Sequence, residues 1–61
     1  MFIATIKNGG FTYYLRGRTW AFNEDRAFKY ETLEAINEAI NAVKDITKPA
    51  LRKLITIEKL A

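Results

Sequence analysis

Residues 2–16 read FIATIKNGGFTYYLR, and this stretch decides the fold. Two runs of apolar and β-prone residues flank Asn8-Gly9-Gly10, and a turn of this composition between two such runs is a strong signal of a β-hairpin. Either Asn8-Gly9 or Gly9-Gly10 can form the two-residue turn. Both choices give the same two faces, because each couples even positions of the first strand to odd positions of the second.

The alternation separates a core side of this hairpin from an outer side. The core side carries apolar and aromatic residues, namely Phe2, Ala4, Ile6, Phe11, Tyr13 and Leu15. The outer side is more polar and consists of Ile3, Thr5, Lys7, Thr12, Tyr14 and Arg16. Gly17 marks a second turn, so residues 18–22 are expected to form a third strand that adds Trp20 and Phe22 to the core side. We expect Phe28 and Tyr30 in the core as well.

A helix is expected over about residues 32–46. Thr32 can cap the free N–H groups of the first turn, and an apolar stripe at helical spacing follows it. The stripe consists of Leu33, Ile36, Ile40 and Val43. Pro49 cannot continue a helix, so the helix is expected to end near Ile46.

Residues 54–59 are expected to form a last strand, with Ile55 and Ile57 facing inward and with pairing beside the first strand in parallel. The sequence therefore predicts one α+β domain over residues 1–61, with element order β-β-β-α-β. In this fold the hairpin and third strand (2–22) form an antiparallel meander, one helix packs on one face, and a final strand follows.

The composition of the 61-residue chain excludes the common catalytic and metal-binding chemistries. It contains no Cys, no His and no Ser, so neither a Ser-His-Asp nor a Cys-His arrangement can be built. The usual ligands of zinc and other transition metals are also missing. We expect a protein that is not an enzyme, has no cofactor and holds no metal ion.

No stretch approaches the roughly 20 apolar residues that cross a bilayer. The first residues lack the basic region of a signal peptide. We therefore expect no contact with a membrane and a cytoplasmic location, which would be the host cell cytoplasm if the chain is encoded by a phage.

The net charge of +3 is unevenly distributed along the chain. Residues 1–22 carry +3, residues 23–45 carry −3 and residues 46–61 carry +3, which together give +3. A molecule with a basic and an acidic part can use either part to attract a partner of opposite charge.

Two groups of residues are candidate binding sites. The first is basic and aromatic and lies on the outer face and second turn, with Lys7, Tyr14, Arg16 and Arg18. An exposed tyrosine beside cationic side chains on a sheet is typical of surfaces that bind single-stranded nucleic acid. The second group lies away from the apolar stripe of the helix and consists of Glu34, Asn37, Glu38 and Asn41. It could dock on a basic protein surface.

Residues 26–35, RAFKYETLEA, resemble an element of two known groups of proteins. In that element an Ala, an aromatic residue, a Lys, a second aromatic residue and a Thr precede a helix. One group is the short, uncharacterised proteins of tailed phages and prophages, whose similarity extends to Gly9, Tyr13, Tyr14, Leu15 and Trp20. The other is the hybrid-binding domain of some type 1 ribonucleases H and of caulimovirus viroplasmin, whose similarity is confined to this segment.

The phage-type resemblance implies an accessory protein that occupies a partner protein, for example an inhibitor of a host or defence factor of the anti-CRISPR kind. We therefore expect a small non-enzymatic protein-binding module. A nucleic-acid-binding module that uses the basic and aromatic sheet face is one alternative. A structural homodimer, joined through edge strands or an apolar helix face, is another.

Overall fold

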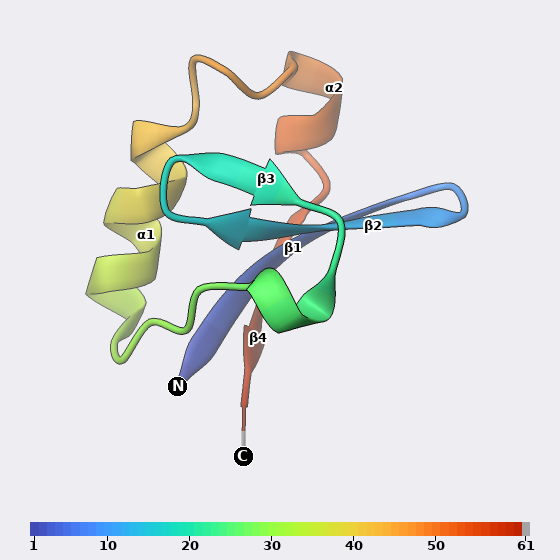
Figure 1. Cartoon of the computed structure of the whole chain (residues 1–61). Helices are drawn as coiled ribbons and strands as arrows, with labels where there is room; N and C mark the ends of the chain where they lie inside the picture. The colour runs from blue at the N-terminus through green and yellow to red at the C-terminus, as the bar shows by residue number, and fades with distance from the viewer. Residues whose placement is uncertain (61) are drawn as a thin grey trace.

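The computed structural model describes residues 1–60. The elements in chain order are β1 (Phe2–Asn8), β2 (Phe11–Arg16), β3 (Thr19–Ala21), the 3₁₀ helix η1 (Glu24–Arg26), α1 (Leu33–Ala42), α2 (Pro49–Arg52) and β4 (Ile55–Lys59). All strand pairs are antiparallel, and the strands lie in the order β3-β2-β1-β4 (Figure 1). Helix α1 packs on one face of this sheet. The predicted α+β architecture is confirmed. Helix α2 falls where residues 50–53 allow a short turn or helix, and η1 is an addition.

Both β-turns contain a glycine in the left-handed region. Asn8 pairs with Phe11, so Gly9-Gly10 forms the first turn rather than Asn8-Gly9. Arg16 pairs with Thr19, which makes Gly17 and Arg18 the second turn. Gly9 has φ +64° and Gly17 has φ +62°, each at the first turn position, where a type II′ hairpin turn needs a positive φ. The third strand is shorter than the expected 18–22.

Helix α1 begins where the sequence predicts but ends earlier. The Thr32 hydroxyl accepts a hydrogen bond from the backbone N–H of Ala35 at 3.1 Å, which confirms the cap. The helix ends at Ala42 instead of near Ile46. The chain then tightens into turns closed by three-residue backbone bonds, such as the bond from the Ile46 N–H to the Val43 carbonyl at 3.2 Å. Pro49 does not terminate α1 but occupies the first turn of α2, where its missing N–H costs nothing.

The last strand pairs with β1, but in the antiparallel direction, so the expected parallel pairing is wrong. Ile6 lies opposite Ile55, and Phe2 lies opposite Lys59. The reason is the segment from 23 to 30, which already returns the chain to the Phe2 end of the sheet. Helix α1 therefore runs in the same direction as β1, and β4 must run back.

This returning segment also becomes part of the sheet. Phe2 and Tyr30 exchange two backbone hydrogen bonds of 2.7 and 2.8 Å, and the Phe28 N–H donates to the Leu15 carbonyl at 3.0 Å. Residues 28–30 thus lie between the start of β1 and the end of β2. Tyr30 is buried in the core cluster with Ala4, Leu15, Ile36 and Val43.

The outer face is less open than its sequence pattern predicts. Ile3 and Thr5 were expected on the solvent side, yet they are 4% and 0% exposed. Residues around η1 lie over Ile3, and the Thr5 hydroxyl donates to a Glu58 carboxylate oxygen at 3.0 Å. The outer face is therefore partly a second packed layer.

No helix within residues 1–60 is long and apolar enough to cross a membrane.

Candidate functional site

Two rows of side chains cross the face of the sheet on which α1 lies. The first row consists of Ile57, Ala4, Leu15 and Trp20. The second row is one step closer to the β1–β2 hairpin tip and consists of Ile55, Ile6, Tyr13 and Phe22. The core cluster under α1 contains Ala4 and Leu15 of the first row. The second row lies beyond this helix.

The hairpin side of the second row faces α2 across a groove of about 510 Å³. Its lining is mostly apolar and consists of Ile6, Asn8, Tyr13, Trp20, Ile46, Thr47, Lys48, Ala50 and Leu51. Since α2 has four residues, it covers only part of the row. The β1–β2 hairpin projects past both helices (Figure 1).

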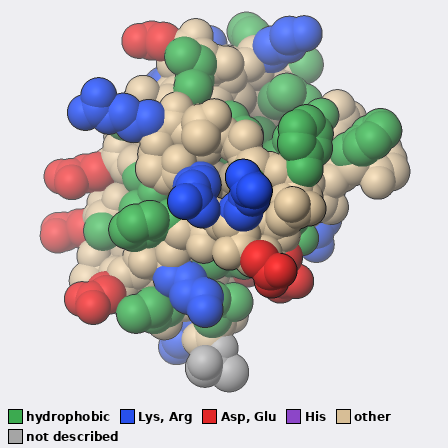
Figure 2. All heavy atoms as spheres, in the orientation of Figure 1, with side chains coloured by type: hydrophobic (Ala, Val, Ile, Leu, Met, Phe, Trp, Pro, Cys, Tyr) green, Lys and Arg blue, Asp and Glu red, His purple; other side chains and the backbone are tan. Residues whose placement is uncertain are grey.

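Large apolar side chains stay exposed beside this groove. We call Phe11, Tyr13, Phe22 and Ile46 the hairpin patch. Phe11 is 65% exposed, Phe22 is 68% exposed and Ile46 is 63% exposed. The Tyr13 and Phe22 rings contact each other with centroids 5.1 Å apart. Figure 2 shows hydrophobic side chains standing out on the projecting hairpin.

These exposures correct the expectation that the aromatic residues form one core. Trp20 is half-buried and Tyr30 is buried, but Phe11 and Phe22 lie on the predicted face without a helix above them. Phe28 is also more exposed than expected, at 53%, and its ring contacts that of Tyr30 at a tilt of 47°, with centroids 4.8 Å apart. The strand alternation gives the face of a residue but not the extent of the layer that covers it.

Hydrogen bonds within the protein engage two polar side chains of the groove wall, those of Trp20 and Thr47. The Trp20 indole N–H donates to the Thr47 hydroxyl at 3.0 Å, and this hydroxyl donates to the Val43 carbonyl at 2.7 Å. The Arg52 Nε–H donates to the Thr47 carbonyl at 3.0 Å. The lining is mainly apolar, and Lys48 is its one charged residue.

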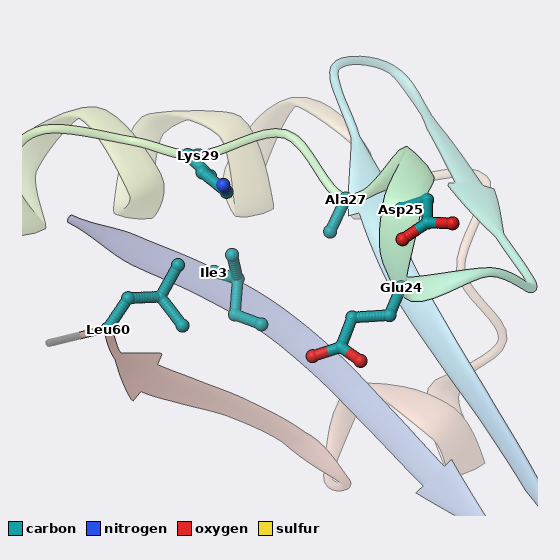
Figure 3. A pocket seen from close by; sticks show the side chains of 6 residues that line it. All are labelled: Ile3, Glu24, Asp25, Ala27, Lys29 and Leu60. Atoms are coloured by element: carbon teal, nitrogen blue, oxygen red, sulfur yellow. The ribbon is translucent and has the colours of Figure 1, made fainter.

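A second hollow, of about 360 Å³, lies on the opposite face of the sheet (Figure 3). Ile3, Ala27 and Leu60 give it an apolar floor, and Glu24, Asp25 and Lys29 supply its charges. In Figure 3 the Glu24 side chain extends from η1 toward Ile3, with Leu60 beyond. The charges are of mixed sign and all three charged residues are exposed, so this hollow has no single electrostatic preference.

The predicted basic and aromatic group is divided between the two ends of the sheet. Lys7 lies near the hairpin tip, whereas Arg16 and Arg18 lie at the opposite end of β2. Thr12, which pairs with Lys7, lies four residues before Arg16 on β2, a separation on the order of 13 Å along the strand. Arg16 donates from Nη1 to the Arg26 carbonyl at 3.3 Å.

The outer face around Tyr14 is not built as an open stacking surface. Tyr14 is half-buried between Thr5 and Ala21 on the neighbouring strands. Glu58 places a carboxylate on the same face, next to Thr5. A negative charge there opposes a phosphate backbone.

The predicted acidic group is brought together. Glu34, Asn37, Glu38 and Asn41 are exposed and lie three and four residues apart along α1, which places them on one stripe of the helix. Acidic side chains are visible along the side of the molecule where α1 lies (Figure 2). To a binding partner, this stripe offers negative charge and hydrogen-bonding groups but no apolar contact.

No group of three or more acidic side chains within residues 1–60 is arranged to hold a metal ion. Comparison of the chain with family models, curated proteins and solved structures finds no match. The resemblances to phage proteins and to the hybrid-binding domain therefore stay predictions, and the hairpin patch with its groove is the strongest candidate site.

Proposed function

We propose that this chain is a small protein-binding module that occupies a partner protein through the hairpin patch and its groove. The observation that carries the proposal is the exposure of Phe11, Phe22 and Ile46, each above 60%, beside a largely apolar groove. Apolar side chains clustered on a surface in this way are typical of protein interaction sites. Aromatic anchors of this kind contribute most of the binding free energy at such sites.

The proposal takes the binding to be non-catalytic, because the chain contains no Ser, Cys or His and cannot form a Ser-His-Asp or Cys-His arrangement. The occupied partner would then be changed by steric blocking or by assembly. A phage-encoded inhibitor of a host or defence factor would work in this manner, and that origin stays a prediction.

Nucleic acid remains the alternative partner, and the arrangement of the charges supports it less. Lys7 on β1 lies beside the start of β2, whereas Arg16 lies at the end of β2. Glu58 on the neighbouring strand β4 adds a negative charge to the same face. Binding through the hairpin patch uses none of these residues.

The test is a selection of peptides from a random display library against the immobilised chain. The selected peptides should carry large apolar residues, and Phe22→Ser should weaken their binding about 30-fold, the typical loss at an interface hot spot. The matched controls Arg16→Ala and Glu38→Gln alter the other two candidate sites and should leave the affinity within about twofold.

Two results would reject the hairpin patch as the site. One is the recovery of no peptide above background. The other is a set of peptides whose affinity drops with Arg16→Ala or Glu38→Gln and is unchanged by Phe22→Ser.

A further inference from the structure

Strand β4 is an edge of the sheet, and within residues 1–60 it pairs with β1 alone. The direction of its backbone groups follows from alternation in an antiparallel pair. The Leu60 N–H donates to the Met1 carbonyl at 2.7 Å, so the backbone N–H and carbonyl groups of Leu60 point toward β1. Glu58 and Thr56 then also point toward β1.

The bonds of β1 agree with this assignment. Phe2 exchanges both of its backbone bonds with Tyr30, on the side away from β4. Lys59, its partner in the register, is therefore not hydrogen-bonded to Phe2, and the backbone N–H and carbonyl of Lys59 point away from β1. By the same alternation Ile57 and Ile55 point outward, so three residues of β4 present free N–H and carbonyl groups.

The other edge of the sheet, strand β3, has fewer free backbone groups. Strand β3 has three residues, and Leu15 bonds to Phe28 on the side away from β3. Thr19 and Ala21 are then the residues of β3 that bond to β2, and Trp20 alone points outward. Prolines and bulges protect the edge strands of many proteins. Strand β4 contains no proline, and its register with β1 is continuous.

We propose that the β4 edge pairs with β4 of a second copy of this chain, so that two four-stranded sheets join into one. An antiparallel pair with Ile57 opposite Ile57 of the second copy places Ile55 opposite Lys59. This register uses all three outward residues of each copy, and each pair exchanges two bonds. A second copy satisfies the edge by symmetry, since both strands present the same groups.

The side chains in this register are compatible. On the helix side, the two Ile57 side chains meet across the two-fold axis, and the aliphatic part of Lys59 lies against Ile55. On the outer side, Thr56 lies opposite Glu58, which repeats between the copies the hydroxyl-to-carboxylate contact that Thr5 makes within one copy. No like charges stand directly opposite each other. Ile55 and Ile57 are half-buried in the single chain and would become more buried.

The small core gives a reason for the pairing. Chains of about this length bury a low fraction of their surface and are commonly stabilised by a metal, by disulfides or by association. Seven apolar residues are buried within residues 1–60. Since an edge-to-edge contact is smaller than the roughly 1,600 Å² of a standard interface, we expect a dissociation constant in the micromolar range.

The test is sedimentation of the purified chain from about 10 µM to about 1 mM, a range that spans micromolar dissociation constants. The mass should rise from 7.0 kDa toward twice that value. A synthetic chain with an N-methyl group on Ile57 keeps every bond to β1 and every side chain, so it should fold and remain monomeric. Phe22→Ser is the matched control and should dimerise like the unmodified chain.

Amide hydrogen exchange gives a second readout that a dimer joined elsewhere would not show. On concentrating the protein, the amides of Ile55, Ile57 and Lys59 should become protected, while those of Thr56 and Glu58 should be equally protected at both concentrations. A mass of 7.0 kDa at every concentration overturns the proposal. So does a dimer that survives N-methylation of Ile57 or that Phe22→Ser abolishes.

Discussion

The indole N–H of Trp20 donates to the hydroxyl of Thr47 at 3.0 Å and so joins β3 to the segment between α1 and α2. The same hydroxyl donates to the Val43 carbonyl at 2.7 Å, so one side chain closes the end of α1 and fixes its distance from the sheet. Thr47 is only 3% exposed. This contact positions Ile46 and the wall of the groove.

Replacing Thr47 with valine should therefore destabilise the fold. Thr47→Val keeps the shape of the side chain but leaves the partly buried indole N–H without an acceptor, which typically costs about 1–3 kcal/mol. Urea denaturation followed by tryptophan fluorescence measures the loss. Thr47→Ser retains the hydroxyl and should lose less. Equal losses for the serine and valine variants would show that the hydrogen bond contributes nothing.

The two glycines of the first turn should respond differently to alanine. Gly9 has φ +64°, whereas Gly10 is not in the left-handed region, and neither has an atom within 4 Å of an added Cβ. Gly9→Ala should lower the free energy of unfolding by about 1–2 kcal/mol, the cost of a left-handed alanine. Gly10→Ala should be neutral or slightly stabilising. Thermal unfolding of the two variants measures the difference, and a larger loss for Gly10→Ala than for Gly9→Ala would contradict the positive φ at Gly9.

Tyr30 should make the fold sensitive to alkali. Burial raises the pKa of its hydroxyl above the ordinary value of 10.0, and the backbone of Gly17 partly offsets the increase. No group within residues 1–60 meets hydrogen-bonding geometry with this buried oxygen. The folded state holds this proton more tightly than the unfolded state does. The resulting contribution to the free energy of unfolding is therefore complete below pH 10 and is lost as the pH rises further.

Tyr30→Phe tests this directly. The variant should be about 1 kcal/mol more stable at neutral pH, because it removes a buried hydroxyl without a partner. It should also lose less stability above pH 10 than the unchanged chain. Denaturation at a series of pH values measures both effects. If the free energy of unfolding falls equally above pH 10 in the two proteins, the titration of Tyr30 is not coupled to unfolding.

The outer face should not act as a nucleic-acid site. Single-stranded DNA, single-stranded RNA and an RNA–DNA hybrid should bind no more tightly than about 10⁻⁴–10⁻⁶ M at physiological salt, the range of non-specific binding. Arg16→Ala and Arg18→Ala should change this little. A tighter, salt-dependent affinity that both variants weaken, with a flatter salt slope, would establish the alternative partner.

Local signals in the sequence predicted the elements well. Gly9, Gly17 and Thr32 each act within a few residues, so the turns and the helix cap follow from nearby sequence. The parity of the strands also placed Leu15 and Trp20 on the helix side correctly.

The errors concern contacts between distant segments. The pairing direction of β4 depends on residues 23–30 crossing back over the sheet, and no residue pattern reveals that path. The burial of Ile3 and Thr5 depends on the same segment and on Glu58. Phe11 and Phe22 are exposed because they lie on the face of the sheet beyond the part that α1 covers, and the strand alternation does not show how far that cover extends.

The most direct test of the hairpin patch is a chemical-shift map of the ¹⁵N-labelled chain during titration with the tightest display-selected peptide. We predict that the largest changes fall on the amides of Tyr13, Phe22, Ile46 and Leu51. Changes concentrated on Glu34 and Glu38, or on Tyr14 and Arg16, would contradict the account and assign the binding to the acidic stripe of α1 or to the outer face.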